Sequence, residues 1–382
     1  MNRNQKSVDN PLSLGAAIWL GIIGSFVLLI LPVFVGALIE DRGFSNVSAG
    51  WIGSADLMGF ALASIFAFRW VRKYSWRSIV LSGLAMIVVG DVSSIFLDDF
   101  WPLFFVRLLL SGIGAGFVIA VPYTLLGDTQ NPERNTGLYF TFNVLGGAAG
   151  LLLYPIIVTH FGTSGLFLVL AITASTAVPV TWFWLPDAGR RVDQTHESFI
   201  AKKATLAILL GIGLFNFGLG GVWAFVERIG IGAGMMSSEV GPILSSTYLV
   251  GMLGSSAAAW QAGRYGYLKP YAVGISVMCL ALTFFITTSG IAMFVTALCL
   301  MNFAWNYSLT YQFSAVFSLD KSGRMSVLII LVQSLGLMLG PGIAGIIVSV
   351  SGFNSSIILG MAMCLVSLGL FIWAHRFVDK LS

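Results

Sequence analysis

Charged residues are scarce in this sequence. Asp, Glu, Lys and Arg make up 9% of its 382 residues, whereas 57% of the residues are apolar. An average soluble domain carries about 25% charged residues, because much of its surface must face water. So few charges cannot keep such an apolar chain in solution. The composition excludes a cytosolic enzyme and a nucleic-acid-binding protein, and it predicts an all-α integral membrane protein.

Cysteine and histidine are also rare, with three residues of each. The cysteines all lie in apolar runs, where a free thiol is usually an inert, buried group. This excludes a disulfide-based scaffold, and the sequence contains neither an HExxH motif nor a His/Cys cluster. We therefore expect no metal ion, no cofactor and no intramembrane enzyme.

Long apolar runs are abundant. A membrane-spanning helix needs about 20 apolar residues, and the sequence predicts twelve such helices. Their ranges are Leu14–Ile39, Val47–Phe68, Ser78–Leu97, Pro102–Leu125, Gly137–Val158, Ser164–Leu185, Ala204–Val226, Val240–Ala262, Pro270–Thr288, Ile291–Val316, Met325–Val350 and Ser355–Phe377.

The longest break between apolar runs, 186–203, predicts a linker between six-helix bundles at 1–185 and 204–382. Placing the N-terminus in the cytoplasm puts every Lys and Arg on the cytoplasmic side except Arg42, Arg107 and Arg228. This agrees with the excess of basic residues that cytoplasmic loops carry. We expect a multi-pass protein of the inner membrane with both termini in the cytoplasm.

The two halves of the chain resemble each other. Glu40, Arg42 and Gly43 at the end of the first predicted helix are echoed by Glu227, Arg228 and Gly230 at the end of the seventh, and other pairs recur at similar offsets. Two pseudo-symmetric repeats of six helices are typical of secondary transporters.

Several motifs extend this interpretation. The loop Arg72–Arg77 and the segment Gly263–Gly266 resemble the loop signatures of the major facilitator superfamily, although both lack its aspartate. Arg107, followed by Gly112, Gly114 and Gly116, is similar to the helix 4 signature of that family, with the glycines one position later. One residue turns a helix by about 100°, so the arginine is expected to face a different direction. The Gly-Pro pair that marks antiporters on helix 5 is absent. The resemblance implies twelve helices in two bundles around a central cavity lined by helices 1, 4, 7 and 10.

Three ionisable residues lie well inside predicted spans: Asp56, Asp91 and Arg107. Each costs about 2.5–3.5 kcal/mol to insert. One interpretation is a structural ion pair that neutralises the arginine, most simply Asp91–Arg107. The other is proton coupling, in which burial favours the neutral acid and the arginine favours the ionised one. The second half of the chain has no acidic counterpart for either aspartate, so coupling would belong to the first half.

Polar and aromatic residues concentrate on helices expected to line the cavity. Such a lining suits a small amphipathic or aromatic organic molecule, particularly an anion. Hydrogen bonding between helices is the alternative role for any one of them. The candidates for substrate binding are Arg107, Tyr123, Asn143, Asn216, Trp223, Tyr248, Asn302, Trp305, Asn306 and Gln333.

Charged residues at the membrane faces are candidates for two gates, with solvated surface charges as the alternative. Cross-pairs Glu40–Arg228 or Arg42–Glu227 would close the outer gate. The inner gate would use Arg72, Lys73, Arg77, Asp128, Arg134, Arg264, Asp320 and Arg324.

The sequence therefore predicts a monomeric, proton-coupled secondary transporter that works by alternating access. It would move a small amphipathic or aromatic organic molecule through the lipid bilayer. A drug-type proton antiporter that exports hydrophobic compounds and a non-transporting receptor on the same fold are the alternatives.

Overall fold

The computed structural model describes residues 8–71, 73–129, 132–187, 199–261, 264–288, 290–319 and 328–379. Within these ranges all regular structure is helical. The chain forms two compact units, 1–193 and 194–382, and each is described by itself. The boundary between them falls within the predicted linker 186–203.

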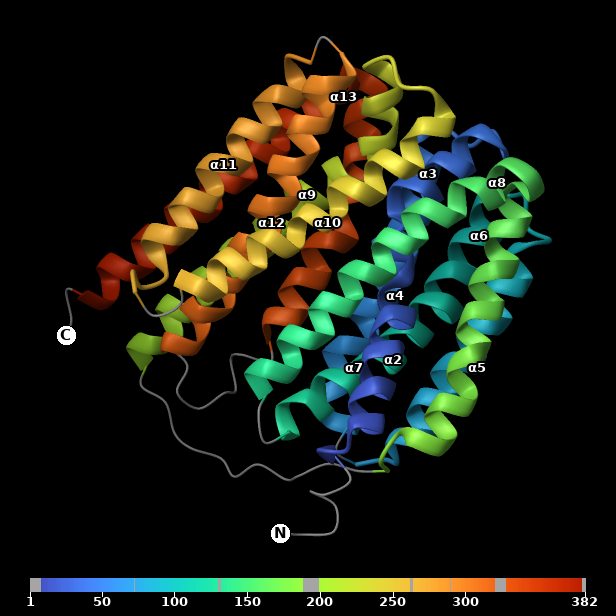
Figure 1. Cartoon of the computed structure of the whole chain (residues 1–382), viewed down its shortest axis with the longest axis horizontal. Coiled ribbons are helices and arrows are strands. Elements are labelled where there is room, and N and C mark those ends of the chain that lie inside the picture. The colour runs from blue at the N-terminus through green and yellow to red at the C-terminus, as the bar shows by residue number, and fades with distance from the viewer. Residues whose placement is uncertain are drawn as a thin grey trace. The chain divides into compact units, whose positions relative to one another are not determined.

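The first unit begins with α2 (Pro11–Leu29), α3 (Leu31–Glu40), α4 (Asn46–Trp70) and α5 (Trp76–Ser94) (Figure 1). It continues with α6 (Phe100–Val106), the π-helix η1 (Arg107–Gly112), α7 (Ile113–Asp128) and α8 (Pro132–Trp184). The second unit contains α9 (Phe199–Gly232), α10 (Ser237–Gln261), α11 (Leu268–Ile286), α12 (Ile291–Leu319) and α13 (Leu328–Asp379).

Two predicted helices are not continuous. The first is interrupted at Ile30, whose φ and ψ of −103° and 14° are not helical, because Pro32 in the next turn lacks an N–H and restricts the preceding backbone. The fourth is divided into α6, η1 and α7. In η1 the hydrogen bonds skip one more residue than in an α-helix, so this segment holds an extra residue.

Conversely, α8 and α13 each combine two predicted helices. Each contains one glycine outside the helical region, Gly162 with φ 64° and Gly352 with φ 77°. Their apolar stretches have 47 residues each, or about 70 Å of helix, which is enough for two crossings. Eight helices in the described ranges have the length and composition to span a membrane. A total of twelve crossings stays a prediction.

The internal repeat also appears in the backbone. Gly43 and Gly234 both have positive φ shortly after the ends of α3 and α9, and Gly162 and Gly352 break α8 and α13. The members of these pairs are 191 and 190 residues apart, close to the spacing of 187 residues between Glu40 and Glu227.

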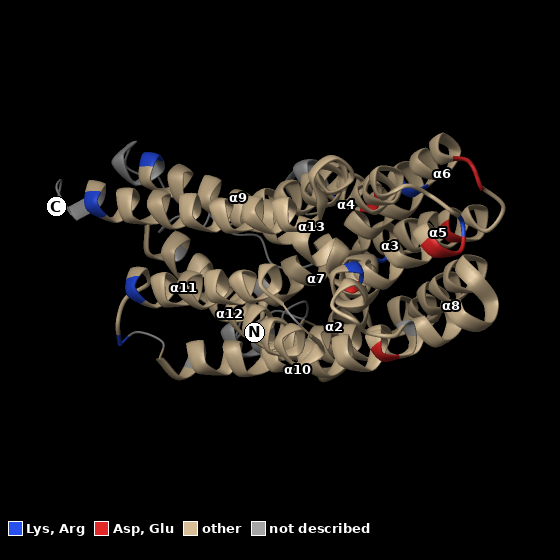
Figure 2. Cartoon of the chain, turned by 90° about the horizontal axis from the view of Figure 1, so that it is seen from above, with Lys and Arg blue, Asp and Glu red and all other residues tan. Residues whose placement is uncertain are grey.

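The core of the first unit is built from apolar side chains of α2, α5, α7 and α8, including Leu20, Trp76, Leu84, Val118 and Ala174. Charged residues are sparse along the helices (Figure 2). Three of the charged side chains that are buried inside this unit are joined by ion pairs, and they form the candidate site.

Candidate functional site: a buried arginine with two aspartates

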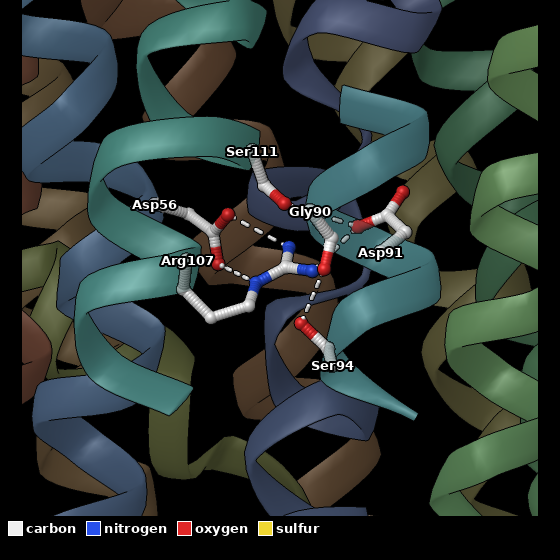
Figure 3. Close-up of polar contacts among 6 residues, drawn as sticks. All are labelled: Asp56, Gly90, Asp91, Ser94, Arg107 and Ser111. Carbon is white, nitrogen blue, oxygen red and sulfur yellow. Dashed lines mark hydrogen bonds and ion pairs between the residues drawn. The ribbon is translucent and has the colours of Figure 1, made fainter. Parts of the chain in front are cut away.

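Arg107 lies between two aspartates from different helices (Figure 3). Its Nε and Nη2 donate to Oδ2 and Oδ1 of Asp56 on α4, at 2.9 and 2.7 Å, and its Nη1 donates to Oδ1 of Asp91 on α5, at 2.5 Å. Ser111 donates to the same Asp91 oxygen at 3.3 Å. The exposed fractions of Arg107, Asp56 and Asp91 are 0%, 5% and 2%. We call Asp56, Asp91 and Arg107 the triad.

Glycines allow the three helices to approach this closely. A Cβ on Gly59 of α4 would lie 2.2 Å from the carbonyl oxygen of Leu108, and one on Gly90 of α5 would lie 2.4 Å from Oγ of Ser111. The backbones of α4 and α5 therefore pack directly against η1. Small residues at helix contacts are a common solution in membranes.

The π-helix begins at Arg107 and ends at Gly112. The one residue that this turn adds equals the one-position delay of Gly112, Gly114 and Gly116 in the sequence. Because Arg107 and Gly112 are joined by a π-turn, the α-helical rotation of about 100° per residue does not apply between them. The direction of Arg107 relative to Gly112, Gly114 and Gly116 therefore depends on this turn. π-Turns occur frequently at functional sites.

The triad resolves one question that the sequence left open, since Arg107 binds both aspartates. With both carboxylates ionised, the buried group has a net charge of −1, and binding one proton makes it neutral. Buried net charge is unfavourable in a low-dielectric region.

The residues that follow α3 form hydrogen bonds within their own unit. Asp41 accepts hydrogen bonds from the N–H and hydroxyl of Thr163, at 2.7 and 2.5 Å, directly after the break at Gly162. The Thr163 hydroxyl and N–H hold the pKa of the Asp41 carboxyl below its ordinary value. Arg42 donates to the carbonyl oxygens of Leu97 and Ile95 beyond the end of α5, and burial lowers its pKa.

Two substrate candidates lie in the first unit. Tyr123 on α7 packs against Tyr139 on α8, with ring centroids 5.4 Å apart. Asn143 accepts a hydrogen bond from Ser25 at 2.9 Å. Sequence reasoning missed Ser25, which lies on α2.

The second unit contains the other candidates. Trp223 on α9 stacks on Tyr248 of α10, with centroids 5.6 Å apart and planes at 28°, and Trp305 of α12 lies edge-on to Phe215 at 6.4 Å. The side-chain amides of Asn216, Asn302 and Asn306 donate to carbonyl oxygens of their own helices. Gln333 lies on α13.

The candidates for the outer gate lie in both units. Among the outer ones, Arg42 binds within the first unit, Glu40 is exposed at the end of α3, and Glu227 and Arg228 lie near the end of α9. A pair between the units stays a prediction.

For the inner gate, Arg77 donates to the carbonyl oxygen of Leu185 at 2.8 Å, and Arg264 lies over the ring of Trp260 at 4.9 Å. Lys73 is exposed, and Asp128 is buried at the end of α7. Outside the described residues, or without a described side chain, are Arg72, Arg134, Asp320 and Arg324.

Comparison with known proteins gives the family. A family model described as Major Facilitator Superfamily matches residues 14–318, most of the chain. The chain belongs to this superfamily. As a member it is a helical, multi-pass membrane protein of a family of transporters.

Three relatives illustrate its neighbourhood. The chain is 24% identical over 217 residues to a gallate transporter of Pseudomonas putida, covering 53% of this chain and 47% of the relative. It is 19% identical over 378 residues to a gentisate transporter of Corynebacterium glutamicum, covering 91% and 84%. It is 25% identical over 213 residues to the inner membrane transport protein YajR of Escherichia coli, covering 54% and 45%. The matches to the first and third thus span about half of those relatives.

Solved structures agree on the fold. A bacterial homologue of the human lysosomal transporter Spinster, in its inward-facing, occupied conformation, gives a TM-score of 0.75 at 14% identity, covering 100% of this chain and 99% of that chain. The inward-facing, unoccupied conformation gives 0.71.

Proposed function

We propose that this protein is a proton-coupled secondary transporter of a small aromatic organic anion. It would move its substrate across the inner membrane by alternating access, with the triad as the proton-binding group. The observation that carries the proposal is the charge of the triad, in which one buried guanidinium binds two buried carboxylates. Release of a proton leaves a net charge in the membrane interior, so proton binding and conformation become energetically linked.

The Asp56 carboxylate supports a role beyond simple neutralisation. Asp91 alone would balance the charge of Arg107, yet Asp56 adds a second, bidentate partner on α4. Insertion of an extra acid is costly, and a purely structural ion pair does not need it. A substrate anion could bind Arg107 directly only if one carboxylate left the guanidinium. The released carboxylate would then bind a proton, so substrate binding and proton binding would be coupled in this form of the mechanism too.

An aromatic substrate is suggested by two independent features. The relatives named for gallate and gentisate are named for hydroxylated aromatic acids. The second unit also presents the stacked pair Trp223–Tyr248. Stacking on such rings favours a flat aromatic molecule over a sugar or an aliphatic ion.

Uptake of radiolabelled gallate and gentisate into proteoliposomes, with an imposed pH gradient of either direction, tests the proposal. We expect uptake when the outside is acidic, abolished by Asp56→Asn. Asp99→Asn is the matched control, because Asp99 is exposed and its side chain makes no capping bond to α6.

Gradient-driven uptake that survives in Asp56→Asn would contradict the coupling role. Stimulation by the opposite gradient would indicate an antiporter. Export of hydrophobic dyes, without movement of either acid, would favour a drug-type transporter.

A further inference from the structure

The guanidinium of Arg107 has donors that the two aspartates do not use. An arginine side chain carries five N–H groups in a fixed fork, and the bonds to Asp56 and Asp91 use three of them. The side chain is fully buried, so bulk water does not reach the remaining two.

Two phenylalanine rings lie close to the same guanidinium. The Cζ atom of Arg107 is 5.3 Å from the ring centroid of Phe34 on α3 and 5.4 Å from that of Phe167 on α8. Both rings are fully buried, and they pack edge-to-face at 5.9 Å. A cation within about 6 Å of an aromatic centroid is attracted to the negative face of the ring, more strongly when both are desolvated.

Phe167 lies close to both the triad and Arg42, which follows the end of α3. The Cζ atom of Arg42 lies 5.2 Å from the same ring. Phe167 follows Thr163 by one helical turn, and Thr163 is bound by Asp41. A movement of the outer part of α8 would therefore shift this ring relative to Arg107.

We propose that Phe34 and Phe167 are positioning residues for the triad, which hold the Arg107 guanidinium in place and so set the pH at which the triad binds a proton. This rests on the proposed function. The two rings and the two carboxylates all lie close to the guanidinium. When a ring no longer holds the guanidinium against the carboxylates, the displaced guanidinium stabilises their ionised forms less, and the triad retains its proton to a higher pH.

The charged and titratable groups around this assembly are few in the described part of the chain. Asp56 and Asp91 contact the guanidinium directly, Arg42 lies beyond Phe167, and Tyr154 on α8 is within electrostatic range of Asp91. A shift caused by changes at Phe34 therefore reports on Arg107, whereas one at Phe167 can also include Arg42.

The test measures protonation directly and needs no substrate. Infrared pH titration of the full-length protein in lipid follows the C=O band of protonated carboxylic acid, assigned with Asp56→Asn and Asp91→Asn. Phe34 and Phe167 are each replaced by 3,4,5-trifluorophenylalanine, which weakens the ring face while keeping nearly the same volume. Phe294 is the matched control, since it is fully buried and its ring neighbour is Phe285, at 5.5 Å.

We expect the titration midpoint to rise by about one pH unit at position 34 or 167, because a less firmly held guanidinium stabilises the ionised carboxylates less, with no change at position 294. Phe167→Tyr should remain close to the wild type, and Phe167→Leu should shift at least as far as the fluorinated ring. Because the fluorinated variants keep the packing, a failure of Phe167→Leu to fold leaves the test intact.

Midpoints at positions 34 and 167 that equal the wild-type value, or that fall below it as a less negative ring face alone would cause, would overturn the positioning role while leaving the proposed function in place. If the wild type shows no carboxylic band that titrates between pH 5 and 9, both ideas fail, because the triad then exchanges no proton. Equal shifts at all three positions would indicate a general effect of fluorination and would also refute the inference.

Discussion

Removing the positive charge of Arg107 tests how much the triad contributes to the free energy of unfolding. In Arg107→Met the side chain keeps much of its length, but both aspartates lose their partner. The wild-type protein makes three charge-assisted hydrogen bonds here, at 2.5 to 2.9 Å, among groups that are at most 5% exposed. Breaking a buried ion pair from one side typically costs about 3–5 kcal/mol, because it leaves an uncompensated charge.

The cost has an upper limit, since the stranded carboxylates can bind protons. A tenfold change in proton affinity corresponds to about 1.4 kcal/mol. We therefore expect Arg107→Met to lose about 3–5 kcal/mol of unfolding free energy at neutral pH, and less at acidic pH. The triple variant Arg107→Met, Asp56→Asn, Asp91→Asn carries no buried charge, so it should recover most of the loss while lacking proton-driven transport.

Unfolding in mixed detergent micelles, followed by circular dichroism at several pH values, measures the stability of the single and triple variants. Gradient-driven uptake in proteoliposomes measures coupling. The reasoning fails if Arg107→Met costs less than about 1 kcal/mol, or if the triple variant is no more stable than the single one.

Three further predictions concern other parts of the molecule. The hydrogen bonds from Thr163 lower the pKa of Asp41. The stability that these bonds contribute is therefore complete above the pKa of the unfolded chain, about 3.9, and is lost as the pH falls through the lower pKa of the folded protein. Thr163→Val should reduce Tm by about 1–3 °C at pH 7 and make Tm less dependent on acid pH in thermal scans. Gly59→Ala should cost about 1–3 kcal/mol in denaturation, since its Cβ would lie 2.2 Å from a backbone oxygen of η1, whereas Gly15→Ala, with nothing within 4 Å, should be nearly neutral. Trp223→Ala should raise KM for gallate about tenfold in uptake assays, and Trp223→Phe should retain most affinity; an unchanged KM in both would exclude this ring from the substrate site.

The sequence determined the class of protein and most of its helices. Apolar runs of about 20 residues leave the backbone no alternative to helices in lipid, because every N–H and C=O must be bonded within the segment. It also identified Asp56, Asp91 and Arg107, since ionisable residues within such runs are too costly to be incidental.

Local backbone irregularities were harder to predict. Pro32 signals the interruption at Ile30, but the π-turn after Arg107 has no signal in an apolar periodicity. It depends on how α4 and α5 pack against this segment through Gly59 and Gly90. A one-residue insertion in a helix can produce a π-turn, or it can rotate the rest of the helix. Packing against the neighbouring helices determines which of the two forms.

The tertiary structure decided the partners. Sequence spacing could not show whether Arg107 binds Asp56 or Asp91, because side chains on separate helices meet only after packing, and the structure brings both to it. It also brought Phe34 and Phe167 to the arginine from α3 and α8. In the sequence these are two of 29 phenylalanines, and only the position of a buried cation distinguishes them from ordinary core residues.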